Sequence, residues 1–242
     1  MILAPAWSAV TSTTHSPLPN LCVLMMAQGE MLGSLHVRID DEAAGLASAR
    51  EQLAVTVGEH IALALANLRL HETLRDQAIR DQLTGLFNRR YMEEMLEREL
   101  LRASRRGNLV GVAMMDIDHF KQFNDLFGHD AGDTILSSVG NYLRTHVRGE
   151  DIVCRYGGDE ISLIMPDSSL DDTRLRADEL RKGIKALQVE HRRRPLGPVS
   201  VSMGVAVFPE NGDGGESVLR AADLALYQAK AEGRDRVITA RK

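Results

Sequence analysis

The stretch RYGGDEISLIMP, residues 155–166, constrains the fold of this chain more than any other segment. Two glycines and two acids stand between apolar runs, with IVC before them and ISLIM after them. Because glycine permits tight turns, the pattern predicts a β-hairpin over 152–165. That hairpin places Asp159 and Glu160 on the turn between two buried strands. Taken alone, the pattern fits a plain hairpin with solvated acids as well as a ligand-binding turn.

Periodic apolar residues around this hairpin predict alternating helices and strands. The mixture of helices and strands around one central hairpin favours an α+β domain with a mostly antiparallel central sheet of the split-βαβ kind. The expected helices are 89–106, 119–147, 170–189 and 216–232, and the other expected strands are 108–116, 199–208 and 236–240.

The N-terminal part has a different texture. Residues 1–20 are rich in Ser, Thr and Pro and predict a loop, and residues 21–39 predict two strands around a turn at 28–30. One helical pattern without Pro then runs over about 41–80, and its length favours a coiled-coil connector in a homodimer. The alternative is a helix packed on its own hairpin. The apolar stripe of this helix comprises Leu46, Leu53, Val57, Ile61, Ala64 and Leu68.

Charge and cysteine content narrow the classes of partner. The formal net charge of −5 over 242 residues argues against general nucleic-acid binding, although bound divalent cations still permit a phosphorylated ligand. Cys22 and Cys154 lie far apart in apolar stretches, so both are expected to be buried thiols in a reducing compartment. The run 61–68 is soon broken by charge and the N-terminus lacks a positive n-region, so we expect no membrane span and a cytoplasmic location.

Acids also follow the strand LVGVAMMDID. A carboxylate at the end of a buried strand is costly unless it is paired or binds a cation, so Asp116 is a candidate metal ligand. Asp118 is expected to cap the helix that starts near His119. If the strand of Asp116 lies beside the hairpin, Asp116 and Asp159 converge at one sheet edge. Oxygen ligands suit Mg²⁺ or Mn²⁺, and two such ions are common machinery for displacement at phosphorus.

The segment ADLALYQAKAEGRDRV near the C-terminus carries a further candidate. Leu224, Tyr227 and Ala231 recur at helical spacing and share one face. Lys230 and Arg234 could project from the helix end toward a polyphosphate. A simpler interpretation is that these cations favour the helix dipole and that a glycine caps the helix. Spacing alone does not decide between the two.

Five segments in this order resemble the GGDEF domains of diguanylate cyclases, which condense two GTP molecules into cyclic di-GMP. The resemblance covers about two-thirds of the chain and implies a fold similar to the palm of polymerases and the adenylate cyclase core. The domains implied are a partial GAF-like segment over 1–42, a helical connector over 43–80 and a GGDEF domain over 81–242. The segments are DQLTGLFNRRYM, MDIDHFKQFNDLFGHDAGD, RGEDIVCRYGGDEI, VSMGVAVFP and ADLALYQAKAEGRD.

The resemblance assigns roles to individual residues. Asp116, Asp159 and the backbone carbonyl of Ile117 match the metal ligands, and Glu160 supports the metal site or the transition state. An amide and a carboxylate suit the guanine edge, and the matching pair is Asn124 and Asp133. The other GTP contacts implied are backbone groups near Phe120 and at Gly157 and Gly158, and the side chains of Lys121, Lys230 and Arg234.

The implied mechanism is an attack by the 3′-OH of one GTP on the α-phosphorus of another, with one GTP held by each subunit of a homodimer. Arg148 and Asp151 form an RxxD pair at the spacing of the family's inhibitory site for cyclic di-GMP, and Arg181 is a second contact there. The alternative for this pair is an exposed ion pair, which contributes little. Ile161 stands where the family usually has Phe, and Asp235 stands where Asn is common.

Two other functions are compatible with parts of the sequence. One is a GGDEF domain that is catalytically weak or inactive and signals by binding cyclic di-GMP or GTP. The other is a polymerase palm, for which the basic template surface is lacking. The segment before the long helix resembles only the last part of a GAF sensor domain, so we expect a truncated or degenerate remnant used for dimerisation.

Overall fold

The computed structural model describes residues 20–27, 29–38 and 47–241. The predicted N-terminal loop therefore lies outside the described residues, apart from Asn20. The chain divides into two compact units, with the boundary between Asp76 and Gln77.

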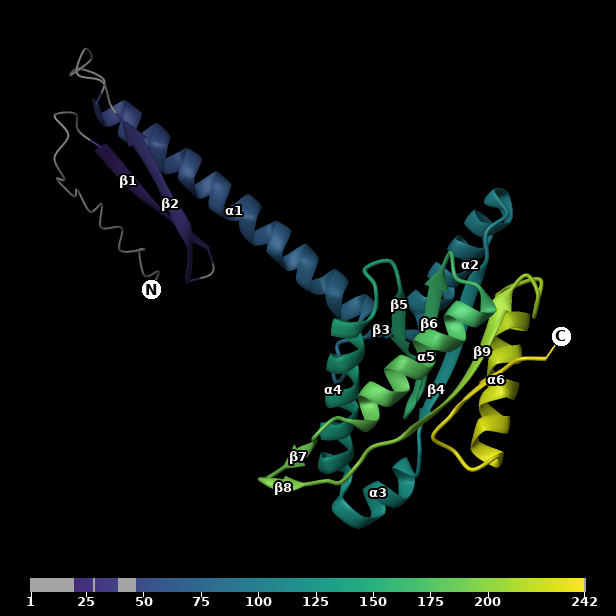
Figure 1. The fold of residues 1–242 in the computed structure, drawn as a ribbon. Coiled ribbons are helices and arrows are strands. Elements are labelled where there is room, and N and C mark those ends of the chain that lie inside the picture. The colour runs from purple at the N-terminus through teal and green to yellow at the C-terminus, as the bar shows by residue number, and fades with distance from the viewer. Residues whose placement is uncertain (1–19, 28, 39–46, 242) are drawn as a thin grey trace. The chain divides into compact units, whose positions relative to one another are not determined.

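The N-terminal unit contains an antiparallel hairpin and most of one long helix (Figure 1). Strands β1, Asn20–Ala27, and β2, Glu30–Arg38, pair as predicted, and helix α1 spans Ala47–Ile79. Ala54 of α1 packs with Leu21 and Val23 of β1 in a small apolar core. A Cβ at Gly58 would lie 2.9 Å from a methyl group of Val23, so small residues line the face of α1 that meets the hairpin.

The predicted apolar stripe of α1 is not the face that packs on the hairpin. Leu53 is 64% exposed and Leu68 is 61% exposed, and Val57 and Ile61 are also exposed. Leu46 lies outside the described residues. The helix therefore packs on its hairpin, as the alternative interpretation held, and still presents the predicted stripe to solvent.

Helix α1 also bears on the expectation of no membrane span. By length and composition alone, its segment Ser48–Ile79 could cross a membrane, with a mean hydropathy of 1.3 over its most apolar window. Within the described residues it is the single helix of this kind. The absence of a span stays a prediction.

The two cysteines differ in their surroundings. Cys154 is buried, and burial raises the pKa of its thiol to about 12, so it is an inert core residue. The prediction that Cys22 is buried is wrong, because Cys22 is only partly covered. Side chains alternate along a strand, and Leu21 and Val23 of β1 take the buried positions on either side of it.

The C-terminal unit is built on a six-stranded sheet with the order β10-β9-β4-β6-β5-β3. Strand β4 is antiparallel to β6 and to β9, whereas the edge strands β10 and β3 run parallel to their neighbours. This mixed, mostly antiparallel sheet confirms the predicted α+β class. The strands are β3 Phe87–Asn88, β4 Val110–Ile117, β5 Ile152–Arg155, β6 Glu160–Pro166, β9 Val201–Phe208 and β10 Val237–Thr239.

Helices cover both faces of this sheet (Figure 1). Apolar side chains of α4, His129–His146, and α5, Leu170–Lys185, share one core with alternate residues of the central strands. Those of α2, Arg89–Arg106, and α6, Gly215–Ala231, share a second core with the residues in between. Strand β4 is buried along its whole length, so only its ends give the chain an accessible site.

Two predicted helices differ in the structure. The helix expected over 119–147 is divided into α3, Phe120–Phe127, and α4, because Gly128 has φ 88° and ψ 160°, outside the helical region. The helix expected over 170–189 ends at Lys185, and a small hairpin that was not predicted follows it. The strands of that hairpin are β7 Glu190–His191 and β8 Arg194–Pro195.

Candidate active site

Acidic side chains meet where the two central strands join the turn at 156–159. Asp116 near the end of β4 is the register partner of Glu160 at the start of β6. Directly opposed residues of antiparallel strands point to the same face of the sheet, so these two carboxylates are neighbours. The structure therefore brings Glu160, and not only Asp159, to the side of Asp116.

The electrostatics of Asp116 reflect this crowding. Burial raises the pKa of the Asp116 carboxyl, and the charges of Asp159 and Glu160 raise it further. The ammonium of Lys230, 2.7 Å from Asp116 Oδ2, acts in the opposite direction. With three acids facing one lysine, the site has an excess of negative charge that a cation would offset.

The donor set fits a hard divalent cation. Within the described residues, no three His, Cys, Asp or Glu side chains lie close enough together to hold a metal unaided. Magnesium is commonly held by one or two carboxylates together with substrate phosphates and water. Asp116, Asp159 and the carbonyl of Ile117 offer oxygen atoms of that kind at the end of β4 and the adjoining turn. The predicted ligands thus suit a cation that arrives with a phosphorylated substrate.

Asp118 does not cap helix α3, so that prediction is wrong. The N-cap residue His119 has no side-chain cap bond, and the Asp118 carboxylate turns the other way. It accepts hydrogen bonds from Ser200 Oγ at 2.8 Å, Ser202 Oγ at 2.6 Å and the backbone N–H of Asp235 at 3.1 Å. A buried carboxylate is stabilised by such donors, and they lie just before β9, within β9 and on the loop after α6 rather than in α3.

Neither the backbone conformation of the turn nor steric crowding requires glycine at positions 157 and 158. Neither Gly157 nor Gly158 has a positive φ, so the turn does not need the left-handed region that glycine permits. A Cβ at Gly158 would meet nothing within 4 Å, and one at Gly157 would meet only the flexible end of Glu160. The pair leaves backbone accessible to an external group, which is a second use of glycine.

Arg155 fixes the signature turn from the strand before it. Its Nε and Nη2 donate to the carbonyl of Gly158 at 3.1 and 2.9 Å, and its Nη1 pairs with Asp81 at 3.1 Å. Asp81 also accepts from the N–H and hydroxyl of Thr84. The pKa of Asp81 is lowered, because these hydrogen bonds and the charge of Arg155 outweigh its burial. The sequence carries only weak signals for this contact, an arginine before the turn and an acid after α1, and the two residues are 74 positions apart.

Helices α3 and α4 place Asn124 against Gly132, the residue before Asp133. Asn124 Oδ1 is buried and has no hydrogen-bond partner, which is uncommon for a buried polar atom. A Cβ at Gly132 would lie only 1.9 Å from this oxygen, so the close approach depends on glycine. Asp133 follows on α4 and is exposed. A buried amide oxygen without a protein partner retains the capacity to accept a hydrogen bond from an external donor.

The remaining predicted GTP contacts lie at helix ends. Lys121 is exposed in the first turn of α3, and Phe120 packs against the core beneath it. Lys230 is in the last turn of α6, and Arg234 is exposed in the loop that follows. Of these cations, Lys230 has a direct contact with a predicted metal ligand.

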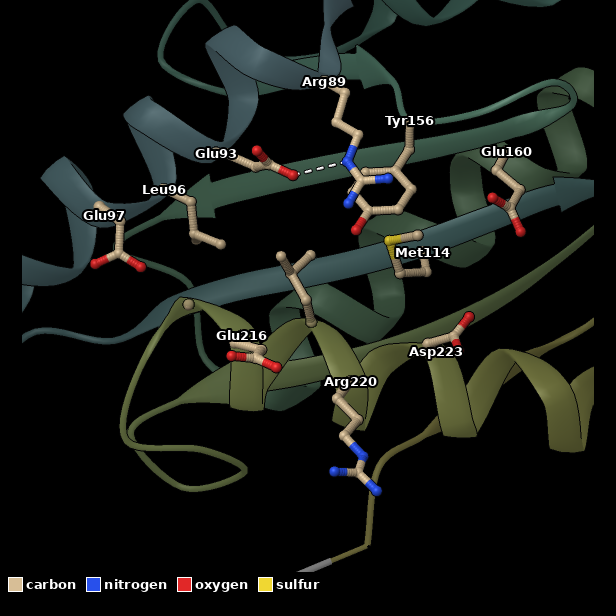
Figure 2. A pocket seen from close by; sticks show the side chains of 12 residues that line it. Arg89, Glu93, Leu96, Glu97, Met114, Tyr156, Glu160, Glu216, Arg220 and Asp223 are labelled. Carbon is tan, nitrogen blue, oxygen red and sulfur yellow. Dashed lines mark hydrogen bonds and ion pairs between the residues drawn. The ribbon is translucent and has the colours of Figure 1, made fainter.

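A cleft that was not predicted extends from Glu160 between α2 and α6 (Figure 2). Its volume is about 640 Å³, and Met114 of β4 contributes to its lining. Arg89 lies 4.3 Å from the centre of the Tyr156 ring and donates to Glu93 at 2.7 Å. The lining residues are Arg89, Glu93, Leu96, Glu97, Met114, Tyr156, Glu160, Gly215, Glu216, Leu219, Arg220 and Asp223.

The RxxD pair lies beside a second, smaller pocket of about 240 Å³. The Asp151 carboxylate accepts from the N–H of Arg148 at 3.0 Å and pairs with Arg176. Asp151 Oδ1 and Arg176 Nη1 are buried without a hydrogen-bond partner. Arg181, the expected second contact, instead pairs with Asp178 and Asp235. The residues that line the pocket are Tyr142, His146, Val147, Arg148, Arg176, Glu179 and Leu180.

Comparisons with known proteins agree with this arrangement. Residues 78–236 match the sequence family described as "Diguanylate cyclase, GGDEF domain". The response regulator PleD of Caulobacter vibrioides is 44% identical over 163 residues, which are 66% of this chain and 36% of the relative. The diguanylate cyclase DgcP of Pseudomonas aeruginosa is 36% identical over 228 residues, 87% of this chain and 34% of the relative. The chain thus spans about a third of the length of these relatives.

Solved structures give the same result. The GGDEF domain of DgcB from Caulobacter crescentus in complex with c-di-GMP matches with a TM-score of 0.65 and 34% identity, covering 68% of this chain and 97% of that one. A structure of its coiled coil and GGDEF domain, also with c-di-GMP, matches with a TM-score of 0.68 and 33% identity over 80% of this chain. This chain belongs to the GGDEF-domain diguanylate cyclase family.

Proposed function

We propose that this chain is a diguanylate cyclase, which condenses two GTP molecules into cyclic di-GMP and releases pyrophosphate. The observation that carries the proposal is the register of Asp116 opposite Glu160, beside Asp159, with a charge excess suited to a divalent cation. Membership of the GGDEF family supports this substrate class and this reaction.

Three groups of residues have separate roles, toward the metal ion, the guanine base and the phosphates of GTP. Asp116, Asp159 and the Ile117 carbonyl would hold Mg²⁺ or Mn²⁺, with Glu160 in support. Such ions, when bound, lower the pKa of the attacking 3′-OH and offset charge on the phosphates. Asn124 and Asp133 recognise the guanine edge, and the unpartnered Asn124 oxygen would gain a hydrogen bond from it. Lys121, Lys230 and Arg234 offset the charge of the triphosphate.

Lys230 has two proposed partners, the Asp116 carboxylate and a phosphate of GTP. Without substrate it neutralises Asp116 at 2.7 Å. Because the lysine stem is flexible, its ammonium could turn to a phosphate of GTP, and the Asp116 carboxylate would then be available to a metal ion. The backbone left open at Gly157 and Gly158 admits the nucleotide to the same corner.

The reaction joins two GTP molecules, so we propose that it takes place between two copies of the domain. The exposed stripe of α1, which includes Leu53 and Leu68, supplies a seam for a coiled-coil dimer. The hairpin before it would be a GAF-like remnant used for dimerisation. The proposed organisation is a GAF-like segment over 1–42, a connector over 43–80 and a GGDEF domain over 81–242.

The departure at Ile161 does not favour an inactive domain. Ile161 is fully buried in the core shared with α4 and α5, on the opposite face of the sheet from Asp116 and Glu160. Its β-branched side chain suits a strand, so the substitution alters packing and leaves the acids in place. The cyclase proposal is therefore preferred to a binding-only module.

Incubation of the purified protein with GTP and Mg²⁺, followed by chromatography, tests the proposal. We expect cyclic di-GMP to accumulate at protein concentrations where light scattering detects a dimer. A protein that is dimeric and binds GTP but forms no cyclic di-GMP would support the binding-only alternative instead.

Replacing Arg155 tests how the turn is held. Arg155→Ala removes both the contact to Gly158 and the pair with Asp81, so we expect kcat to fall about tenfold, the equivalent of ~1.4 kcal/mol in the barrier. Arg155→Lys should not restore kcat, because one ammonium cannot replace a planar fork that bridges two acceptors. The matched control is Arg174→Ala, an exposed arginine on α5. Wild-type kcat in Arg155→Ala would show that the turn holds itself.

We further propose that cyclic di-GMP inhibits the enzyme by binding at the pocket of Arg148 and Asp151. Arg148 and Arg176 both line this pocket, so it offers two guanidinium groups to the phosphates of a ligand. Arg176 lines this pocket and is the stronger candidate for a second arginine contact.

For this inhibitory site, Arg148→Ala should raise final product accumulation and weaken cyclic di-GMP binding by about tenfold, as expected for a lost charge-assisted contact. Arg148 is exposed, so the fold should not change. Calorimetric titration with cyclic di-GMP measures the affinity. Arg144→Ala, one turn earlier on α4, is the control, and unchanged binding in Arg148→Ala would refute the assignment.

A further inference from the structure

The loop between α6 and β10 has an unusual backbone. Arg234 has φ 61° and Asp235 has φ 47°, so two consecutive residues other than glycine lie in the left-handed region. Such a conformation is costly for a residue other than glycine and persists only where its surroundings fix it. Loops of this kind are held by specific contacts, and the contacts here are identifiable.

One contact holds the backbone of Asp235. Its N–H donates to Asp118 Oδ2 at 3.1 Å, and the same carboxylate receives the hydroxyls of Ser200 and Ser202. Asp118 is 9% exposed, so its oxygens depend on these donors. The carboxylate joins the residue after β4, the start of β9 and the loop after α6.

A second set of contacts holds the side chain of Asp235. Its carboxylate pairs with Arg181 and with Lys185, both on α5. The Arg181 side chain is only 13% exposed and also pairs with Asp178 at 2.9 Å. An arginine held by one carboxylate on its own helix and by a second on the loop has little freedom, and it transmits that restraint to the loop.

We propose that Asp118, Arg181 and Asp235 are positioning residues that hold the 232–236 loop so that Arg234 meets the triphosphate of GTP. This inference rests on the proposed function, which makes Arg234 a phosphate contact. Arg181 acts through Asp235 on its neighbour Arg234, and it does not touch the nucleotide. The proposal also gives Arg181 a role apart from the inhibitory pocket, which it does not line.

A double-mutant cycle tests this inference. The probe is 3′-deoxy-GTP with Mg²⁺, which lacks the attacking hydroxyl, and calorimetry measures its Kd for the full chain. We expect Arg234→Ala and Arg181→Ala each to raise Kd about fivefold, the scale of one charge-assisted contact. Because Arg181 acts through Arg234, the double variant should bind no more weakly than Arg234→Ala alone. Arg174→Ala on the same helix is the control and should keep the wild-type Kd.

A second variant covers the case in which Arg181→Ala fails to fold. Asp235→Asn keeps a residue type that tolerates the left-handed region and keeps the N–H to Asp118, but it removes both ion pairs. It should reproduce the rise in Kd and the non-additivity with Arg234→Ala.

The outcomes are distinguishable. Additive losses, or wild-type affinity in both Arg181→Ala and Asp235→Asn while Arg234→Ala weakens binding, would overturn the positioning role and leave the proposed function intact. Wild-type affinity in Arg234→Ala itself would overturn the phosphate contact on which the inference depends. Equal and non-additive losses in Kd, with unchanged inhibition by cyclic di-GMP in Arg181→Ala, would establish it.

Discussion

Asp116→Asn should lower cyclic di-GMP formation by a factor on the order of 10³ or more, the scale of losing a principal electrostatic stabiliser of a transition state. Asp116 is the buried member of the acid group, and it faces Glu160 and Lys230 directly. An amide keeps the size of the side chain but binds a hard divalent cation weakly. Initial rates of product formation from GTP measure the loss, and Asp159→Ala should change the rate in the same direction.

The fold should survive Asp116→Asn. The change removes one of three acids that repel one another, and Lys230, with a side chain 33% exposed, can turn to water. We therefore expect the thermal midpoint to stay at or above that of the wild type. Asp171→Asn, an exposed acid on α5, is the matched control and should keep full activity. Substantial turnover by a folded Asp116→Asn variant would remove Asp116 from the catalytic site.

Gly204→Ala should destabilise the C-terminal unit by about 3 kcal/mol or more, the upper range for overpacking a core. A Cβ at Gly204 in β9 would lie 2.1 Å from the carbonyl oxygen of Ala222 and 2.1 Å from the nitrogen of Leu226. Both are backbone atoms of α6, so no side-chain rotation relieves the clash. Helix α6, which carries Lys230, would have to move away from the sheet.

Thermal unfolding followed by circular dichroism measures this effect. For a unit of this size each kcal/mol corresponds to about 2–4 °C, so the midpoint should fall by about 6–12 °C. Gly149→Ala is the control, because its Cβ would meet nothing within 4 Å and its φ is not in the left-handed region. An unchanged midpoint for Gly204→Ala would mean that α6 is not seated on β9 as the structure has it.

Much of the fold follows from local sequence rules. Helix α2 coincides with its predicted range 89–106, because an apolar stripe begins after the capping Asn88 and ends before Gly107, which has φ 71°. The hairpin of β5 and β6 follows from two apolar runs around one turn. The division between α3 and α4 was missed because Gly128 stands inside an otherwise continuous helical pattern, and a lone glycine does not always end a helix.

The candidate site was predictable only where each residue carries its own signal. An acid at the end of a buried strand, such as Asp116, is recognisable from the sequence because a buried charge needs a partner. The role of Asp118 is not recognisable in this way. Its partners Ser200 and Asp235 are far away in the sequence, and only the folded sheet brings them to it. For the same reason Arg181 could not be placed from spacing. Its partner Asp235 lies 54 residues away on another element.

The stoichiometry of the reaction tests directly whether this chain is a diguanylate cyclase. Wild-type protein supplied with GTP and Mg²⁺ would be analysed for nucleotides by chromatography and for pyrophosphate by a coupled assay. We expect one cyclic di-GMP and two pyrophosphates for every two GTP consumed, and a rate of product formation lower by a factor on the order of 10³ or more in Asp116→Asn. Intact GTP, or conversion of GTP to GDP and inorganic phosphate, by a folded dimer would contradict this proposal.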